Sequence, residues 1–486
     1  MTKNPSASKS SMWMMGVSIG EKIFALGIYI ILARFLDIVE FGIVAFSLFI
    51  LDFMTMIVTS GVREYIVTRE KTSKLFINTC FLVVFGLSLI FAVAGYLVTP
   101  LLISHSTENS ELLTLILQVI VFLPLVSSFN MIQLSILQRD FAFKAIALNN
   151  FVSTSVSGVI AAYMAYNGFG AWALVAYRYI QVVVITLLLT IKAKFIPCLA
   201  FNKSICKDCY KFSLPLIFSE IFNFCSSRIM EIFVSFFYGP ASFALLDIAR
   251  KFTKIITQVS LTALRPVCLS FISQPNETSK GSRHSEFSVN ITFLVIPILI
   301  LLSIYADGYV SLIFGEQWLE AIPIIQFLGF AALAQTITWY FPLLLIVHGK
   351  TKQVFYLNVL FFIISIIGGL LSYQLAFENY IFVQVVIFNL IGLLKIYYLH
   401  EKRLISISDI KAYYAPVVLS TVSFAIITYA LKVSIFDTFK MNNILDLAFI
   451  SSLAIVSLII HYGLTYILFK TFARRLISDV KQFKQK

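Results

Sequence analysis

The stretch from Phe212 to Pro266 decides how this chain folds: FSLPLIFSEIFNFCSSRIMEIFVSFFYGPASFALLDIARKFTKIITQVSLTALRP. The stretch predicts two membrane-length helices joined by the YGP turn at 238–240, because glycine and proline interrupt helices. We expect no break inside either helix.

Both helices of this hairpin carry charged and polar side chains on one face. At 100° per residue, the second helix gathers six of them in a stripe about 100° wide: Asp247, Arg250, Lys251, Lys254, Gln258 and Arg265. The first helix has a matching face with Glu220, Asn223, Ser227 and Glu231, and Arg228 lies beside it. A charge at the bilayer centre costs about 2.5–3.5 kcal/mol, so these side chains are expected to line a wet cavity.

Two interpretations of these charges compete. In the first, Asp247–Lys251 and Arg228–Glu231 are helix-spaced ion pairs that only hold helices together. The second is an anion pathway, which the balance of charge favours. The hairpin has five cations (Arg228, Arg250, Lys251, Lys254, Arg265) and three anions (Glu220, Glu231, Asp247), a net charge of +2. Intramembrane charges of this kind usually mark substrate or ion pathways.

Composition places the whole chain in the membrane. It has 486 residues, of which 59% are hydrophobic and 13% charged, and apolar runs near membrane length recur along it. No loop is long enough to fold as a separate domain or to carry the catalytic groups of a membrane polymerase or glycosyltransferase. We therefore predict a polytopic, all-α membrane protein that is not an enzyme. We expect no catalytic residues, cofactor or metal, and the single Cys206–Cys209 CxxC pair does not change this expectation.

Fourteen membrane spans are predicted from the apolar runs: 12–33, 41–60, 76–98, 112–135, 146–166, 171–191, 213–237, 242–271, 288–306, 320–347, 354–374, 379–398, 412–431 and 446–468. With the N-terminus inside, 27 of the 37 Lys and Arg residues lie on the cytoplasmic side, 3 outside and 7 within spans. This asymmetry predicts that both termini are cytoplasmic. The net charge of +13 therefore reflects topology, and no nucleic-acid partner is expected.

An internal repeat organises these spans. ARFLDIVEFG at 33–42 joins the first two spans, and SFFYGPASFA at 235–244 joins the seventh and eighth in the same register. A six-span repeat in one orientation predicts two bundles related by a pseudo-two-fold axis along the membrane normal. The predicted domains are 1–200 and 201–405, followed by two extra helices and a basic cytoplasmic tail in 406–486.

The first half also carries intramembrane charges. Glu21 and Lys22 lie in the first span, and Asp52 lies in the second on one face with Thr55 and Thr59. As repeat partners of the charged hairpin, these residues are expected to face it, because substrates of such folds sit between the halves. Arg178 in the sixth span either pairs locally or contributes to the cavity.

The sequence resembles the polysaccharide flippases of the multidrug/oligosaccharidyl-lipid/polysaccharide exporter superfamily, often called Wzx-type. The resemblance is carried by LARFLDIVEFGIVAFSLF (32–49), QRDFAFKAIALNNFVSTSVSGVIAAYMAYNGFGAWALVA (138–176), FSLPLIFSEIFNFCSSRIMEIFVSFFYGPASFALLDIARKF (212–252) and PIIQFLGFAALAQTITWYFPLLLIVHGKTKQ (323–353). It covers about the first 400 residues. The family's Leu-Gly-Pro in the first turn is replaced by LDI at 36–38, and its Gly-Arg after the tenth span by Gly349-Lys350.

The resemblance implies two six-helix bundles in a V around a central cavity, with two peripheral helices. It also implies a bacterial inner-membrane flippase that moves undecaprenyl-diphosphate-linked oligosaccharide to the outer leaflet by alternating access. The product would be O-antigen, capsule or exopolysaccharide, and the partners would be membrane lipids and the polymerase and glycosyltransferases of the pathway. The cavity cations that the resemblance implies are Lys22, Arg228, Arg250, Lys251 and Lys254, and the charge patterns add Arg178 and Arg265 as substrate-binding candidates.

Two questions stay open at this point. A multidrug or metabolite cation antiporter of the same superfamily is the alternative function, although organic cations would favour an acidic cavity. Glu21, Asp52, Glu231 and Asp247 are expected to be counter-charges or carriers of a coupling H⁺ or Na⁺. Asp52 is the favoured carrier, because its own span contains no cation, whereas Asp247 has Arg250 and Lys251 one turn away.

Overall fold

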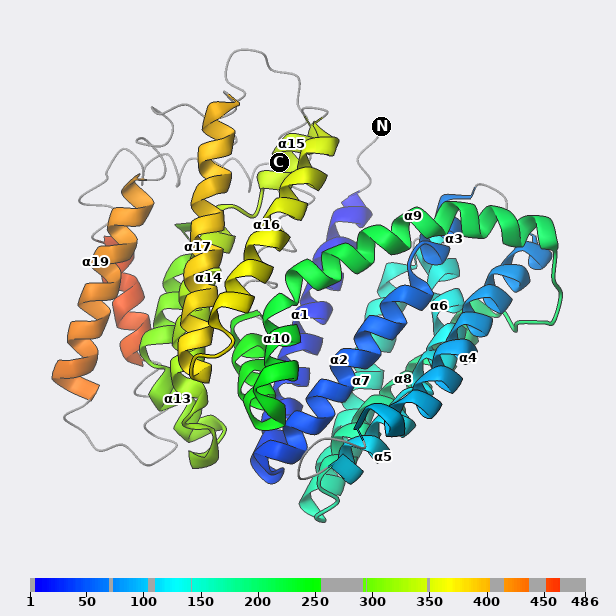
Figure 1. The fold of residues 1–486 in the computed structure, drawn as a ribbon, viewed down its shortest axis with the longest axis horizontal. Coiled ribbons are helices and arrows are strands. Elements are labelled where there is room, and N and C mark those ends of the chain that lie inside the picture. The colour runs from blue at the N-terminus through cyan, green and yellow to red at the C-terminus, as the bar shows by residue number, and fades with distance from the viewer. Residues whose placement is uncertain are drawn as a thin grey trace. The chain divides into compact units, whose positions relative to one another are not determined.

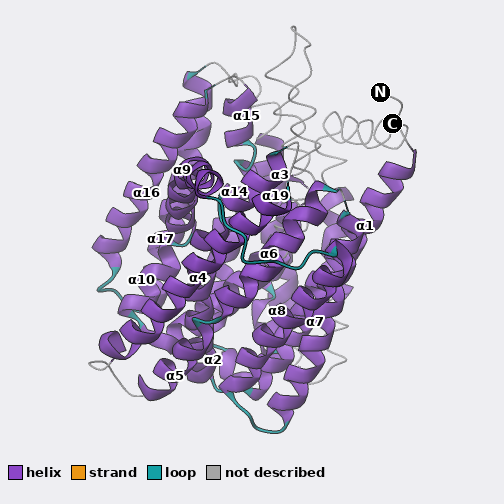
Figure 2. Ribbon diagram, turned by 90° about the vertical axis from the view of Figure 1, so that its right-hand side faces the viewer, coloured by secondary structure: helices purple, strands orange, loops and turns teal. Residues whose placement is uncertain are grey.

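The computed structural model describes residues 5–69, 73–103, 110–140, 142–254, 292–293, 295–347, 350–402, 415–436 and 452–463 (Figure 1). These residues fold into helices joined by turns, and no strand occurs among them (Figure 2). Nine candidate membrane spans occur among these residues, of which Ser110–Arg139 comprises two helices, and there are ten if the bent pair Val295–Ile304 and Ala306–Ile313 forms one span. The predicted all-α membrane architecture is confirmed, and the count of fourteen spans stays a prediction.

The contacts divide the chain into two compact units, residues 1–244 and 245–486. The repeat assigns residues 201–244 to the second bundle, but the contacts place these residues in the first unit. The division into bundles at 1–200 and 201–405 therefore stays a prediction. The helices of the first unit are α1 (Pro5–Phe35), α2 (Ile38–Thr59), α3 (Val62–Thr68), α4 (Lys74–Ile103), α5 (Ser110–Ile120), α6 (Leu123–Arg139), α7 (Phe143–Tyr166), α8 (Ala171–Ala193), α9 (Lys203–Ser227) and α10 (Ile229–Phe237).

Two predicted spans of this unit consist of two helices each. The span expected at 112–135 is divided between α5 and α6, where Pro124 stands in the first turn of α6. The span expected at 213–237 is divided between α9 and α10, so the expectation of an unbroken helix is wrong. The break falls at Arg228, whose backbone has φ −119° and ψ 18°. Because Arg228 is neither glycine nor proline, the residue types alone did not indicate it.

Helix α2 is held at both of its ends. Asp37 caps it, with its carboxylate oxygen Oδ2 accepting a hydrogen bond of 2.9 Å from the Val39 amide. Near that end, Gly42 lies so close to the Pro240 carbonyl that a Cβ would have no room. At the other end, Gly61 adopts a φ of +78°, and a Cβ there would lie 2.6 Å from Ser213 Cα. The middle of α2, with Asp52, lies between these two close approaches.

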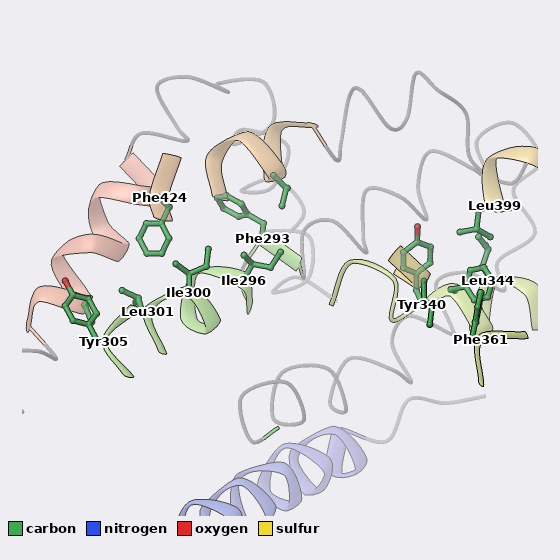
Figure 3. Packing of buried hydrophobic residues seen from close by; sticks show 14 of the residues in the cluster. Phe293, Ile296, Ile300, Leu301, Tyr305, Tyr340, Leu344, Phe361, Leu399 and Phe424 are labelled. Carbon is green, nitrogen blue, oxygen red and sulfur yellow. The ribbon is translucent and has the colours of Figure 1, made fainter. Parts of the chain in front are cut away.

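The second unit contains α13 (Ala306–Ile313), the 3₁₀ turn η1 (Glu316–Trp318), α14 (Ala321–Ile337), α15 (Phe341–Val347), α16 (Thr351–Ser372), α17 (Phe377–Glu401), α19 (Ala415–Leu431) and η3 (Lys432–Phe436). Its buried core joins side chains from distant parts of the unit (Figure 3). Ile300, Tyr340 and Phe361 belong to it together with Phe424 of α19 and Leu453 of helix Ser452–Gly463. The helices expected as peripheral additions are therefore packed on the core of this unit.

Candidate functional site

Asp52 of α2 lies between two arginines from other helices. Its carboxylate oxygen Oδ1 is 3.7 Å from the Arg178 guanidinium of α8, and its other oxygen, Oδ2, is 3.9 Å from that of Arg228. Each carboxylate oxygen thus faces one guanidinium. Both separations exceed the 2.7–2.9 Å that is usual for charge-assisted hydrogen bonds, so Asp52 is loosely held by the two cations.

The break between α9 and α10 positions Arg228 for this contact. Its guanidinium carbon lies 5.6 Å from the centre of the Phe224 ring, one turn earlier in α9. The same ring contacts Phe49 and Phe53 of α2, at centroid separations of 5.6 and 5.3 Å. Because residues four apart share a helix face, Phe49 and Phe53 lie on one face of α2 and contact the Phe224 ring together.

Arg228 also pairs with a buried carboxylate. Its guanidinium donates a hydrogen bond of 3.2 Å to Glu231 of α10, and the Glu231 side chain is only 3% exposed. The i, i+3 spacing of these two residues was the basis for predicting the pair, and the structure contains it. The two arginines and the two carboxylates of this cluster are balanced in formal charge.

A hydrogen-bond relay extends the cluster from α8 through α7 to α1. The Arg178 guanidinium donates to the Gln181 side-chain oxygen at 3.0 Å, and the Gln181 amide donates to the Thr154 hydroxyl at 3.0 Å. The Thr154 hydroxyl in turn donates to the Glu21 carboxylate at 3.5 Å. All donors point in the same direction, so the relay connects the guanidinium of Arg178 to the carboxylate of Glu21.

We call this set the polar network, and it comprises Glu21, Asp52, Thr154, Arg178, Gln181, Arg228 and Glu231. It brings together five of the residues selected from the sequence: Glu21, Asp52, Arg178, Arg228 and Glu231. Lys22 is half-buried in α1 next to Glu21. The sequence favours Asp52 as the carrier because its own span contains no cation, and the structure adds two cationic neighbours from other helices.

Sequence reasoning missed Thr154 and Gln181. Gln181 is a polar residue in the apolar helix α8, three positions after Arg178, and this spacing could have indicated it. Thr154 follows Ser153 in α7, a helix whose small residues allow close approach to α1. For example, Gly158 approaches Ile28 of α1 so closely that a Cβ would lie 2.6 Å from the Ile28 side chain.

The remaining candidates lie in the helix that the structure describes from residue 239 to residue 254 (helix 239–254). In it, the Lys251 ammonium donates to the Asp247 carboxylate at 2.7 Å, an i, i+4 pair predicted from the spacing. Arg250 is half-buried and Lys254 is exposed. Arg265 lies outside the described residues.

Comparison with known proteins places this membrane protein in a family. The family model described as "polysaccharide biosynthesis protein" matches residues 31–323, more than half of the chain. The chain belongs to the polysaccharide biosynthesis protein family. The resemblance found in the sequence is thereby confirmed at the level of the family.

Individual relatives of the chain come from several bacteria. It is 26% identical over 302 residues to the succinoglycan biosynthesis transport protein ExoT of Rhizobium meliloti (strain 1021), covering 62% of this chain and 60% of ExoT. It is 23% identical over 359 residues to the lipopolysaccharide biosynthesis protein WzxC of Escherichia coli (strain K12), covering 70% of each chain. The match thus spans 60% of the length of ExoT, less than two thirds.

Solved structures show the fold. The chain is similar to the lipid II flippase MurJ in an inward closed conformation, with a TM-score of 0.73 over 95% of this chain and 99% of MurJ at 14% identity. An inward-facing multidrug resistance MATE family transporter of the MOP superfamily gives a TM-score of 0.56, covering 80% of this chain and 94% of that one at 15% identity. A flippase and a drug transporter therefore share this fold, and the fold alone does not choose between them. Both are named as a flippase or a transporter, and ExoT is named as a transport protein.

Proposed function

We propose that this protein is a flippase that moves undecaprenyl-diphosphate-linked oligosaccharide repeat units across the bacterial cytoplasmic membrane by alternating access. The product would be assembled into O-antigen, capsule or exopolysaccharide. The observation that carries the proposal is the pair of arginines around Asp52, in a chain of the polysaccharide biosynthesis protein family. Asp52 and Arg178 lie in α2 and α8, which are candidate membrane spans, and Arg228 lies at the break between α9 and α10. Membership of the polysaccharide biosynthesis protein family supports a lipid-linked saccharide as the transported substrate.

In this proposal the Asp52 carboxylate pairs with the two arginines when no substrate is bound, and the substrate phosphate replaces it there. Arg178 and Arg228 approach one carboxylate from two helices, at 3.7 and 3.9 Å. Guanidinium groups match phosphate oxygens with paired hydrogen bonds, so a diphosphate would bind both arginines more closely than Asp52 does. Asp52 would then be displaced, and it would return when the substrate leaves.

The carboxylates divide into two roles. Asp52, Glu231 and Asp247 each have an arginine or lysine partner and would act as counter-charges. Glu21 is hydrogen-bonded to a neutral hydroxyl, that of Thr154, and its charged and titratable neighbours are Lys22 and Tyr177. We therefore assign proton exchange to Glu21, from which the relay through Gln181 leads to Arg178. Lys22, Arg250, Lys251, Lys254 and Arg265 remain proposed phosphate-binding residues.

The test is translocation of a lipid-diphosphate-linked oligosaccharide by the purified full-length protein in proteoliposomes. Arg178→Ala, and Arg228→Ala combined with Glu231→Gln, should each slow translocation by about 10- to 100-fold, since each removes hydrogen bonds to a charged group. Glu231→Gln is included so that no buried carboxylate loses the Arg228 guanidinium. Arg63→Ala is the matched control, because Arg63 pairs with Glu64 outside the polar network and is half exposed.

Two outcomes would contradict the proposal. Normal translocation by both arginine variants would remove the anion-binding role. A wild-type protein that carries organic cations but no lipid-linked oligosaccharide would instead be the multidrug or metabolite antiporter.

The proposed location is the bacterial inner membrane, with both termini cytoplasmic and with the polymerase and glycosyltransferases of the pathway as partners. Cysteine replacements at two exposed positions test the orientation in a chain that lacks its other cysteines. A cysteine replacing Asn167, between α7 and α8, should react with an impermeant thiol reagent from outside intact cells. A cysteine replacing Lys203, at the start of α9, should not, and the reverse labelling would invert the topology.

A further inference from the structure

The connection from α8 to α9, residues 194–202, presents large apolar side chains to its surroundings. Ile196 is 77% exposed, Leu199 90% and Phe201 57%. The connection begins directly after Ala193, the last residue of the candidate span in α8. A contiguous set of exposed apolar side chains on an ordered segment usually marks a contact surface.

Buried polar side chains fix the backbone of this connection to the helices beneath it. The Gln133 amide donates to the Phe195 carbonyl at 2.6 Å, and the Asn78 oxygen accepts from the Cys198 amide at 2.9 Å. The Thr79 hydroxyl oxygen accepts from the Asn202 amide at 3.1 Å. Gln133, Asn78 and Thr79 are all buried. The chain therefore uses buried hydrogen-bonding groups to hold a short loop whose apolar side chains face outward.

A row of lysines adjoins the loop. Lys203, Lys207 and Lys211 are exposed and four residues apart in α9, so they lie along one face and span about 12 Å at 1.5 Å per residue. Two further exposed lysines, Lys192 and Lys194, precede the loop, and Asp208 is the one acidic residue in 192–212. We call residues 192–212 the basic-apolar segment.

The other face of the first turns of α9 is packed. Cys209 is fully buried in the cluster formed with Tyr65 of α3 and Phe76 of α4, and Ile205 packs against it. Figure 1 shows this part of α9 crossing the ends of α4 and α6, beside α3. The helix thus begins by running over the end of the bundle instead of along its side.

We propose that the basic-apolar segment docks on the headgroup layer of the membrane leaflet at this end of the protein, with anionic phospholipid as its partner. Ile196, Leu199 and Phe201 would enter the boundary between headgroups and acyl chains. The lysines would extend their ammonium groups to lipid phosphates. Charge complementarity favours anionic lipid, because five exposed lysines are opposed by Asp208 alone. Docking would anchor the beginning of α9, whose last turn leads to Arg228.

Fluorescence quenching tests the depth of the loop in the full-length protein reconstituted in bilayers. An environment-sensitive probe is attached to a cysteine replacing Leu199, in a chain whose native cysteines are replaced. The matched control carries the probe at Asp140, an exposed polar position where α6 ends. We expect quenching by doxyl-labelled lipid at Leu199 and quenching by aqueous iodide at Asp140. Equal access of iodide to both positions would overturn the proposal.

The partner's charge is tested with the same probe and two spin-labelled lipids, phosphatidylglycerol and phosphatidylcholine. Phosphatidylglycerol should quench more strongly, and this preference should fall by roughly fivefold per lysine removed in Lys203→Gln, Lys207→Gln and Lys211→Gln. Lys352→Gln removes an exposed lysine of α16 in the second unit and should leave the preference unchanged. A preference that survives all three α9 substitutions would overturn the assignment to anionic lipid.

Hydrogen–deuterium exchange on the unmodified protein gives an independent measurement. Residues 194–212 should exchange more slowly in nanodiscs containing phosphatidylglycerol than in pure phosphatidylcholine, whereas 167–170 should not change. Identical exchange of 194–212 in both lipids would contradict the proposal. Protection that appears only in native membranes and not with purified lipid would identify a protein partner and would also overturn it.

Discussion

The polar network of the first unit and helix 239–254 both carry buried or half-buried charges, but they are built differently. In the polar network, Asp52 meets Arg178 and Arg228 from two other helices, at separations of 3.7 and 3.9 Å. In helix 239–254, Asp247 meets Lys251 one turn away at 2.7 Å. The pair within one helix is tight and local. The pairs between helices are loose and depend on how α2, α8 and α9 pack.

This difference determines which of the ion pairs changes when the helices move. A pair within one helix survives any rearrangement that keeps the helix intact. A pair between helices changes whenever those helices move, so its strength reports the conformational state. Any rearrangement that moves α2 against α8 or α9 would therefore change the pairs of Asp52 with Arg178 and Arg228.

The largest expected effect comes from breaking the most buried pair. Arg228→Gln leaves Glu231, whose side chain is 3% exposed, without its guanidinium. Removing one partner of a buried charge pair costs about 3–5 kcal/mol, so folded protein should fall sharply. Glu231→Gln in the same chain should restore abundance without restoring translocation. Lys251→Gln is the contrast, because Asp247 and Lys251 are more exposed, and it should leave abundance near wild type.

Fluorescence-detected size exclusion before and after heating measures this comparison. Equal losses of folded protein in Arg228→Gln and Lys251→Gln would remove the distinction between the two regions. Restored translocation in the double variant would show that Arg228 acts only by neutralising Glu231.

A middle-sized effect is expected at Glu21, which lies at the end of the relay. Glu21→Gln keeps the hydrogen bond with Thr154 but cannot exchange a proton, so translocation should lose its dependence on the pH gradient. Asp52→Asn and Asp247→Asn should lower the rate and keep that dependence. Proteoliposomes with imposed gradients provide the measurement. A Glu21→Gln protein that responds fully to the gradient would exclude this carrier.

The smallest effect is expected from interrupting the relay in its middle. Gln181→Leu removes the hydrogen bonds with Arg178 and Thr154 while keeping Arg178 itself. The bond between Gln181 and Thr154 is neutral and contributes about 0.5–1.5 kcal/mol, which corresponds to a rate change of roughly two- to tenfold. The bond from the charged Arg178 guanidinium adds little to this, because that side chain is 37% exposed and water can replace Gln181. Thr186→Val on the same helix is the control, because the Thr186 hydroxyl bonds to the Val182 carbonyl of its own helix.

The dependence of translocation on the pH gradient shows whether Gln181 positions Arg178 or only stabilises the fold. Gln181→Leu should weaken the response to pH as well as the rate, whereas Thr186→Val should change neither. A Gln181→Leu protein with a slower rate and an unaltered pH response would mean that the relay only supports packing.

The sequence by itself determined the membrane helices and the local charge pairs of this protein. Long apolar runs have one stable outcome in a bilayer, because every backbone group must be hydrogen-bonded within its own helix. Residues three or four apart on a helix face meet for the same local reason, so Arg228–Glu231 and Asp247–Lys251 could be predicted from spacing.

Only the tertiary structure decided the partners of Asp52 and the path from Arg178 to Glu21. These contacts join α1, α2, α7, α8 and the break between α9 and α10. Nothing in the local sequence of α2 indicates which distant helix packs against it. The break at Arg228 is of the same kind, since no glycine or proline marks it. Periodicity determines the face of a helix on which a charge lies, and packing between helices determines what that charge meets.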